Sequence, residues 1–203
     1  MEHVSGGTIA SLLKKFGVFE ESVFRRYTSQ IIDAVTYLHA NNVVHRDIKG
    51  SNMMVTTTGL IKLIDFGTAK KTTEDLVTPL SAMKLDYSIK GTPYWKAPEV
   101  VQMPGEPTCK ADIWSIGCTV IEMATGSPPY FHLQPMSALF TIGSMEKPSP
   151  RLPDEFSETA KDFVNKCLIK SMHRRPSALE LGRHRFMLRE FIKQHQDNRG
   201  FYI

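Results

Sequence analysis

A segment near the middle of the chain places the strongest constraint on the fold. It reads Asp112-Ile-Trp-Ser-Ile-Gly-Cys-Thr-Val-Ile-Glu-Met123, and as a helix it would present apolar side chains on nearly every face. A helix of this kind is stable in water only when other elements surround it. The pattern therefore predicts a helix over residues 110–125 that is buried all round and that ends at Gly126.

A second helix is indicated between residues 21 and 40, where apolar residues recur with helical spacing. Val23, Tyr27, Ile31 and Val35 are four residues apart, Phe24, Ala34 and Leu38 widen this apolar stripe, and charged side chains fall mostly on the other side. The Asn pair that follows at 41 and 42 suits the end of this helix. Further helices are expected at residues 136–143, 157–168, 177–182 and 184–196.

The extended segments of the chain are short. Two apolar runs, Asn52–Val55 and Leu60–Ile64, are separated by Thr56–Gly59, which predicts two strands joined by a turn. Residues 68–90 are polar and have no sustained period, which indicates a long loop of the kind that tends to be functional. The 203 residues thus predict a mainly α fold with a few short β-strands and no linker that marks a domain boundary.

The composition excludes several classes of protein. The formal net charge is only +4 and the basic residues are spread along the chain, so we expect no nucleic-acid partner. No run approaches the roughly 18 apolar residues of a membrane helix, and the first residues do not form a signal peptide. The cysteines (Cys109, Cys118 and Cys167) are odd in number and far apart, which argues against disulfides or a zinc site. We expect a cytoplasmic protein, with the nucleus as the alternative, and no membrane partner.

Three short motifs carry the chemistry. His45-Arg-Asp-Ile-Lys-Gly-Ser-Asn52 is followed by Asp65-Phe-Gly67 and then by Ala97-Pro-Glu99. In this order and spacing the motifs closely resemble the signature of the eukaryotic protein kinases. The lysine two residues after the aspartate of the first motif is similar to the serine/threonine type of the family. The resemblance covers the C-terminal lobe of the kinase fold almost end to end.

This resemblance implies a role for each polar residue of the site. Asp47 would orient the substrate hydroxyl and take its proton, and Lys49 would lie beside the γ-phosphate of ATP. Asn52 and Asp65 would bind Mg²⁺, and Thr92 would contact both Asp47 and Lys49. An isolated Asp or Asn is usually a turn residue or a helix cap, but the spacing between these motifs favours the kinase interpretation.

The resemblance also divides the chain into functional segments. Residues 1–5 match the hinge between kinase lobes, 45–52 the catalytic loop, 65–99 the activation segment and 100–196 the helical subdomain. The cofactors that it implies are ATP and Mg²⁺. The candidate residues for binding them are Glu2 and Val4 of the hinge together with Lys49, Ser51, Asn52 and Asp65.

Other residues are expected to support the site without touching the substrate. The resemblance implies that Asp112 holds the backbone of the catalytic loop and that Glu99 pairs with Arg175. For His45 we favour a core histidine packed beneath the loop. These residues would fix the geometry in which the reacting groups meet.

Arg46 has a regulatory interpretation. It is similar to the family's receptor for a phosphate on the activation segment. Ser88 is the favoured phosphosite, and Thr78 and Ser81 are weaker candidates. The alternative is that Ser88 is an unmodified serine of a solvated loop.

Several stretches look like one branch of the family, the MAP kinase kinase kinase group. These are Gly6-Gly-Thr-Ile9, the catalytic loop and Gly91-Thr-Pro-Tyr-Trp95. Lys96 departs from the pattern, because those relatives usually carry methionine there, beside the surface that binds peptides. The expected partner is a protein substrate in a MAP kinase cascade, and a downstream kinase is one candidate.

The N-terminal lobe of a kinase has no counterpart that we recognise in the sequence, because a glycine-rich loop and an early strand lysine are both missing. One hypothesis is an ATP- and Mg²⁺-dependent kinase whose N-lobe lies on other sequence. The alternative is a non-catalytic C-lobe fragment that acts as a protein-interaction module. The chain alone is expected to be inactive. An N-lobe or a partner is expected to cover an apolar surface formed by Met1, Val4, Met53, Met54, Val55 and Ile64.

Overall fold

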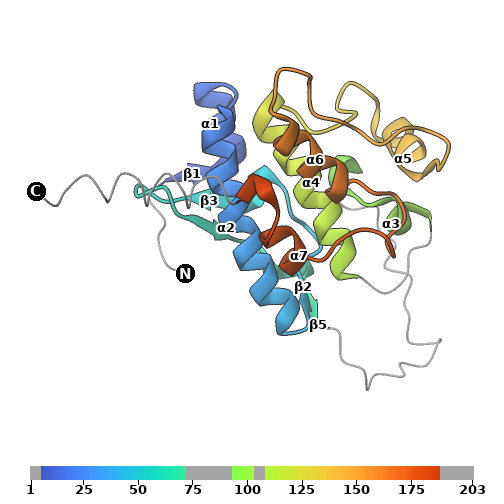
Figure 1. Ribbon diagram of the computed structural model, residues 1–203, viewed down its shortest axis with the longest axis horizontal. Helices are drawn as coiled ribbons and strands as arrows, with labels where there is room; N and C mark the ends of the chain where they lie inside the picture. Colours follow the sequence, from blue (N-terminus) through green and yellow to red (C-terminus); the bar gives the residue numbers. More distant parts are fainter. Residues whose placement is uncertain (1–5, 72–92, 103–107, 188–203) are drawn as a thin grey trace, which may run out of the picture.

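The computed structural model describes residues 6–71, 93–102 and 108–187 (Figure 1). Helices make up most of this part of the chain. The α-helices are α1 (Ile9–Phe16), α2 (Glu21–Ala40), α3 (Pro98–Gln102), α4 (Cys109–Thr125), α5 (Pro135–Gly143), α6 (Glu158–Cys167) and α7 (Ala178–Gly182). The strands are β1 (Gly7–Thr8), β2 (Val43–Val44), β3 (Met53–Val55), β4 (Ile61–Leu63) and β5 (Lys70–Lys71). Short 3₁₀ turns lie at η1 (Gly50–Asn52), η2 (Phe66–Thr68) and η4 (Pro93–Trp95).

The central helix α4 is buried as the sequence predicts. Every residue from Asp112 to Ala124 is buried, with α2 and α6 packed against it (Figure 1). Gly117 permits the close approach of α6, because a Cβ atom at this position would lie 2.7 Å from the Cβ of Cys167. Gly126 ends the helix with a left-handed backbone, φ 83°, which confirms the predicted stop.

Helix α2 has the predicted bounds, but its buried face differs from the predicted stripe. Phe24, Thr28, Ile31, Ile32 and Val35 are buried, whereas Val23 is exposed. Phe24, Ile31 and Val35 belong to the predicted stripe, whereas Thr28 and Ile32 are buried in addition, because α2 packs against two helices, α4 and α7. The ring of Phe24 lies edge-on to that of Phe156, and this contact ties α2 to the loop before α6.

The strands form two small antiparallel sheets. One has the order β1-β3-β4, in which Met53 pairs with Leu63 and Val55 with Ile61, as the predicted strand-turn-strand pattern requires. The other joins β2 to β5, with Val44 paired to Lys70. Together these sheets connect the two ends of residues 45–52 to the two ends of residues 64–69.

The prediction that Met53 and Val55 belong to an apolar surface near β3 is wrong. Met53 and Val55 are buried among the helices, because alternate residues of a strand face opposite sides and these two share the inner side. Met54 and Ile64 are partly buried. Met1 and Val4 lie outside the described residues.

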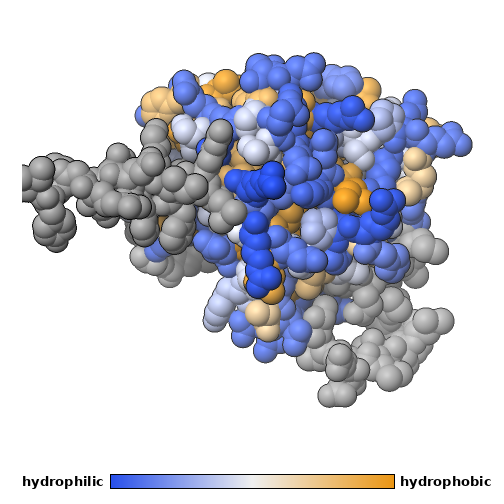
Figure 2. Space-filling view, in the orientation of Figure 1, coloured by the Kyte–Doolittle hydropathy of each residue, from blue (hydrophilic) through white to orange (hydrophobic). Residues whose placement is uncertain are grey.

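Helix α1 and the single-turn helix α3 were not predicted. The signal for α1 is present in the sequence, because Thr8 caps the helix by accepting a hydrogen bond from the Ser11 amide and Ile9 and Leu13 share its buried face. The helix expected at 184–196 lies mostly outside the described residues. Within the described ranges, no helix combines the length and the apolarity needed to cross a membrane. The face drawn in Figure 2 is mostly hydrophilic, with small separate hydrophobic areas.

Candidate active site

The loop between β2 and β3 is held in place by Asp112 of α4. The Oδ2 atom of Asp112 accepts a hydrogen bond from the His45 amide at 2.9 Å, and Oδ1 accepts one from the Arg46 amide at 2.8 Å. Asp112 is 1% exposed, so both bonds are shielded from water. This confirms the prediction that Asp112 holds the backbone of the loop. Arg46 has a left-handed backbone with φ 72°, which is uncommon for a residue with a side chain and which the two bonds stabilise.

His39 of α2 adds a positive charge behind this anchor. Its Nε2 atom lies 2.9 Å from Oδ2 of Asp112. Burial by itself would lower the pKa of His39, but the hydrogen bond to Asp112, a further one to Cys109 and the negative charge of Asp112 raise the pKa to about 9. His39 is therefore protonated at neutral pH and pairs with the carboxylate that holds the catalytic loop.

The His39 pair predicts a dependence of stability on pH. Because the pKa is raised from about 6.5 when unfolded to about 9 when folded, the stabilisation is complete below pH 6.5 and is lost as the pH rises through 9. We expect the free energy of unfolding to fall by about 1–3 kcal/mol over this range, and His39→Gln should remove that part of the fall. Urea denaturation of both proteins at about pH 6.5 and above pH 9 measures this change in the free energy of unfolding. Equal pH dependence in the two proteins would contradict the assignment.

Three polar residues of the loop meet at one carboxylate oxygen. The Oδ2 atom of Asp47 lies 2.8 Å from Nζ of Lys49 and accepts a hydrogen bond from Nδ2 of Asn52 at 2.7 Å. The same Nδ2 donates to the backbone carbonyl of Asp47 at 2.9 Å. The carboxylate is thereby fixed in direction. Its Oδ1 atom makes no hydrogen bond within the described residues and remains available to another molecule.

The fold ties Asp65 to both ends of this loop. After β4 pairs with β3, the Ile64 amide donates to the Asn52 carbonyl at 3.0 Å, so Asp65 follows directly on a residue bonded to Asn52. Beyond Asp65, β5 pairs with β2, which leads into His45. Asp65 has φ 62°, and its Oδ1 accepts a hydrogen bond from the Gly67 amide at 3.2 Å. A left-handed aspartate is uncommon and often marks a functional position.

The oxygen atoms of Asn52 and Asp65 fit the requirements of Mg²⁺. Because Asn52 uses Nδ2 to bind Asp47, its Oδ1 is left without a hydrogen bond within the described residues, and the same holds for Oδ2 of Asp65. Mg²⁺ prefers such oxygen ligands, and it usually takes one or two from the protein and others from phosphates and water. No group of three His, Cys, Asp or Glu residues in the described ranges could hold a metal ion without such help.

His45 and Phe66 pack together beneath the loop. Their ring centroids are 5.0 Å apart in an edge-on arrangement, and His45 is fully buried. The His45 carbonyl accepts a hydrogen bond from Oγ1 of Thr68 at 3.1 Å. His45 is therefore a core histidine, as predicted, and the residues after Asp65 are fastened to the catalytic loop through it.

Sequence reasoning missed the role of Glu122. Its Oε2 atom accepts hydrogen bonds from the Gly50 amide and from Nε1 of Trp95, both at 3.0 Å. Burial raises the pKa of Glu122, against the effect of these two bonds and of the Lys49 charge. Glycine at position 50 leaves room for this carboxylate, since a Cβ there would lie 2.7 Å from Oε1 of Glu122 and would require the carboxylate to move. The signal available in the sequence was that Asp112 and Glu122 are the only charged residues of the segment 112–123. In the structure both of them bind the loop.

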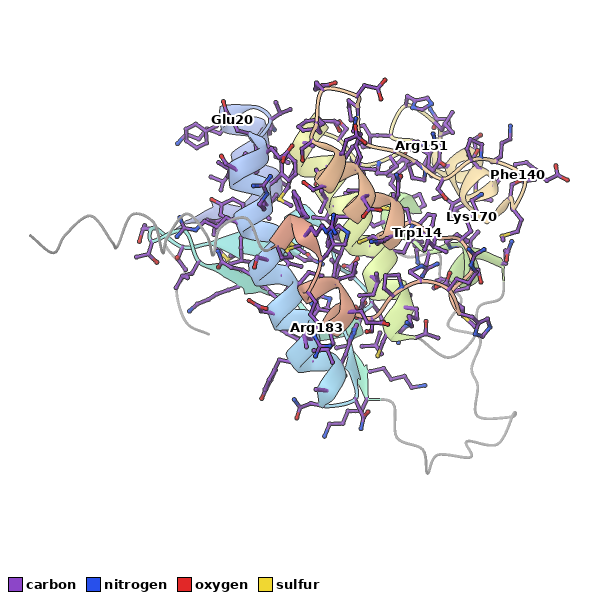
Figure 3. All side chains as sticks on the ribbon, viewed as in Figure 1. Glu20, Trp114, Phe140, Arg151, Lys170 and Arg183 are labelled. Atoms are coloured by element: carbon purple, nitrogen blue, oxygen red, sulfur yellow. The ribbon has the colours of Figure 1, made fainter. Side chains whose placement is uncertain are left out.

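The predicted pair of Glu99 and Arg175 is present. The guanidinium group donates to both carboxylate oxygens, at 2.7 and 2.9 Å, and Arg175 is 1% exposed. The pair joins the start of α3 to the segment after α6. Arg175 also lies over the ring of Trp114, which occupies the middle of the helical body (Figure 3).

The remaining predicted site residues are not brought together by the described part of the chain. Ser51 is exposed on η1. Glu2, Val4 and Thr92 lie outside the described residues, and so do the proposed phosphosites Thr78, Ser81 and Ser88. The described site therefore consists of Asp47, Lys49, Asn52 and Asp65, with supporting contacts from α4.

The described residues thus provide a fixed carboxylate paired with a lysine and, on the same loop or tied to it, two side chains with oxygen atoms suited to Mg²⁺, as a phosphoryl-transfer site requires. Residues 1–187 match the family model described as "Protein kinase domain". The chain belongs to the protein kinase domain family.

Several relatives are MAP kinase kinase kinases. The chain is 52% identical over 189 residues to mitogen-activated protein kinase kinase kinase 19 of Homo sapiens, covering 93% of this chain and 14% of that protein. It is 46% identical over 187 residues to mitogen-activated protein kinase kinase kinase YODA of Arabidopsis thaliana, covering 92% of this chain and 20% of the relative. The chain thus spans a fifth or less of the length of these two proteins.

Proposed function

We propose that this chain is the C-terminal lobe of a serine/threonine protein kinase of a MAP kinase cascade. Its reaction is the transfer of a phosphoryl group from ATP to a hydroxyl group of a protein substrate, for which a downstream kinase is the candidate. The observation that carries the proposal is the joining of Asp47, Lys49 and Asn52 at one carboxylate oxygen, with Asp65 tied to the same loop.

Each residue of the site has a separate task. Asp47 accepts a hydrogen bond from the substrate hydroxyl through Oδ1 and takes its proton late in the reaction. Lys49 places a cation beside the transferred group, and its ion pair with Asp47 holds both side chains in position. Asn52 and Asp65 would hold Mg²⁺ through the oxygen atoms that make no hydrogen bond within the described residues. When bound, ATP would supply the phosphoryl group, and Mg²⁺ would offset the negative charge of the phosphates.

Residues on α4 and α2 support the reaction by fixing the loop. Asp112, with the His39 charge behind it, holds the backbone before Asp47, and Glu122 holds the backbone after Lys49. Such positioning matters because phosphoryl transfer depends on alignment and electrostatics more than on covalent chemistry by the protein. Thr92, Glu2, Val4 and Ser51 keep the roles that the resemblance implies, as part of this proposal.

A polypeptide of these 203 residues alone has no glycine-rich loop and no early strand lysine to bind phosphates. We therefore expect it to bind ATP weakly and to transfer phosphate at a negligible rate. The alternative function, a non-catalytic interaction module, predicts that no additional sequence restores activity. The test is a chimera that joins the sequence preceding the matched region of the human relative to the N-terminus of this chain. The proposal predicts that the chimera phosphorylates a generic protein substrate with ATP and Mg²⁺.

A further inference from the structure

The backbone of Lys96 is fixed against α4. The preceding residue, Trp95, donates from its indole Nε1 to Oε2 of Glu122, and its carbonyl accepts a hydrogen bond from Oγ of Ser115 at 2.7 Å. The Lys96 amide donates to the Pro93 carbonyl at 3.0 Å. Lys96 therefore has a defined place, although nothing in the phosphoryl-transfer reaction described above uses it.

That place is next to the catalytic loop. The oxygen of Glu122 that binds Trp95 also binds the amide of Gly50, so one atom joins the neighbours of Lys49 and Lys96. Consistent with this, the charged groups that act on Lys96 are Asp47, Arg46 and Lys49. Lys96 therefore lies near the Asp47 end of the catalytic loop.

Cations outnumber carboxylates among the charged groups that act on Lys96. They are two cations, Arg46 and Lys49, and one carboxylate, that of Asp47, whose Oδ2 is already bound by Lys49 and Asn52. Lys96 is partly buried, and burial, the largest influence on it, lowers its pKa. Within the described residues no carboxylate lies in ion-pair distance of its ammonium group. A partly desolvated ammonium group with no ion-pair partner among the described residues is in an unfavourable position, and an incoming anion would relieve that cost.

We propose that Lys96 is a specificity-determining residue that binds an anionic side chain, a carboxylate or a phosphate, of the protein substrate beside the hydroxyl group that Asp47 orients. The proposal rests on the proposed function and deepens it. The Asp47 side of the site is where the acceptor hydroxyl binds, so the anion is a substrate group adjacent in sequence to the acceptor. Related kinases with methionine at this position would lack the preference.

The test measures the binding of fluorescent peptides to the 203-residue chain by anisotropy, so it does not depend on turnover. The peptides contain one Ser, and at each neighbouring position in turn they carry Glu, Gln or phosphoserine. At low ionic strength we expect the best Glu and phosphoserine peptides to bind about 5- to 10-fold more tightly than the matched Gln peptide. Added salt should reduce this ratio. Comparison of the Glu and phosphoserine series identifies which anion is preferred.

Three variants assign the preference to Lys96. Lys96→Met should bring the Glu-to-Gln ratio close to one, and Lys96→Arg should retain it. Lys147→Met, which removes an exposed lysine elsewhere, should leave it unchanged. The same ratio in Lys96→Met as in the unaltered chain, or no preference for any anionic peptide in the unaltered chain, overturns the proposal.

Binding of Mn²⁺·ATP to the same variants separates this proposal from the proposed function. Lys96→Met should bind Mn²⁺·ATP as the unaltered chain does. If Lys96→Met instead weakens nucleotide binding and leaves the peptide ratio unchanged, Lys96 serves the nucleotide and the proposal is wrong. If a Lys96-dependent peptide preference is found and the folded chimera is inactive, the kinase function fails while the anion site stands.

Discussion

Replacing Asp47 by Asn in the chimeric kinase is expected to lower the turnover number by about 10³-fold. The substitution keeps the size of the side chain and an oxygen that can accept hydrogen bonds from Lys49 and Asn52, but it removes the charge and the group that accepts the proton of the substrate hydroxyl. Because Asp47 is not itself one of the proposed Mg²⁺ ligands, the Michaelis constant for ATP should change less than the turnover number. Steady-state kinetics with a protein substrate separate these two effects.

The matched control is Asp33→Asn, which makes the same chemical change at an exposed position of α2. It should leave turnover unaltered. A chimera whose Asp47→Asn variant keeps more than about a tenth of the activity would mean that Asp47 is not the general base. A chimera without activity, properly folded by circular dichroism, would favour the interaction-module alternative.

Of the variants considered, the one that removes the side chain of Arg175 is expected to lower the free energy of unfolding most. Arg175 is buried and makes two hydrogen bonds to Glu99 and others to the carbonyls of Lys110 and Ile169, at 2.6 and 2.9 Å. In Arg175→Leu the Glu99 carboxylate and these carbonyls would lose the hydrogen bonds from the guanidinium group. Breaking one side of a buried pair typically costs about 3–5 kcal/mol, and chemical denaturation would measure the change.

Two further variants serve as controls for this prediction. Arg174→Leu alters the neighbouring exposed arginine and should change the free energy of unfolding by less than about 0.5 kcal/mol. Arg175→Lys keeps the charge but cannot bind both oxygens of Glu99, so its loss should lie between the other two. If Arg175→Leu is as stable as Arg174→Leu, the pair does not join α3 to the segment after α6 in the way described.

The sequence predicted those elements whose local pattern agrees with their final packing. Helix α4 is surrounded on all sides, so the apolar character of the segment was sufficient to identify it, and β3 and β4 are joined by a recognisable turn. The buried face of α2 was placed incorrectly at Val23, because that face depends on the positions of α4 and α7. Local periodicity contains no information about which neighbours a helix meets.

In the candidate site, too, features with a local sequence pattern were predicted and features that depend on tertiary contacts were not. The motif resemblance identified Asp47, Asn52 and Asp65, and the two sheets explain why residues distant in sequence lie at one loop. Glu122 was missed because an acidic residue in an apolar helix does not reveal its partners. Its two bonds, to Gly50 and Trp95, join segments far apart in the chain and appear only in three dimensions.

The central claim is that Asn52 and Asp65 share one metal ion bound to a nucleotide. Paramagnetic broadening by Mn²⁺·ATP tests it directly, since NMR detects even weak complexes, with Mn²⁺ in place of Mg²⁺. We predict selective loss of the amide signals of Asn52, Asp65 and Gly67, no effect on α7, and no selective loss in Asn52→Ala or Asp65→Asn. Broadening that is absent from these amides, or that persists unchanged in both variants, would contradict the account.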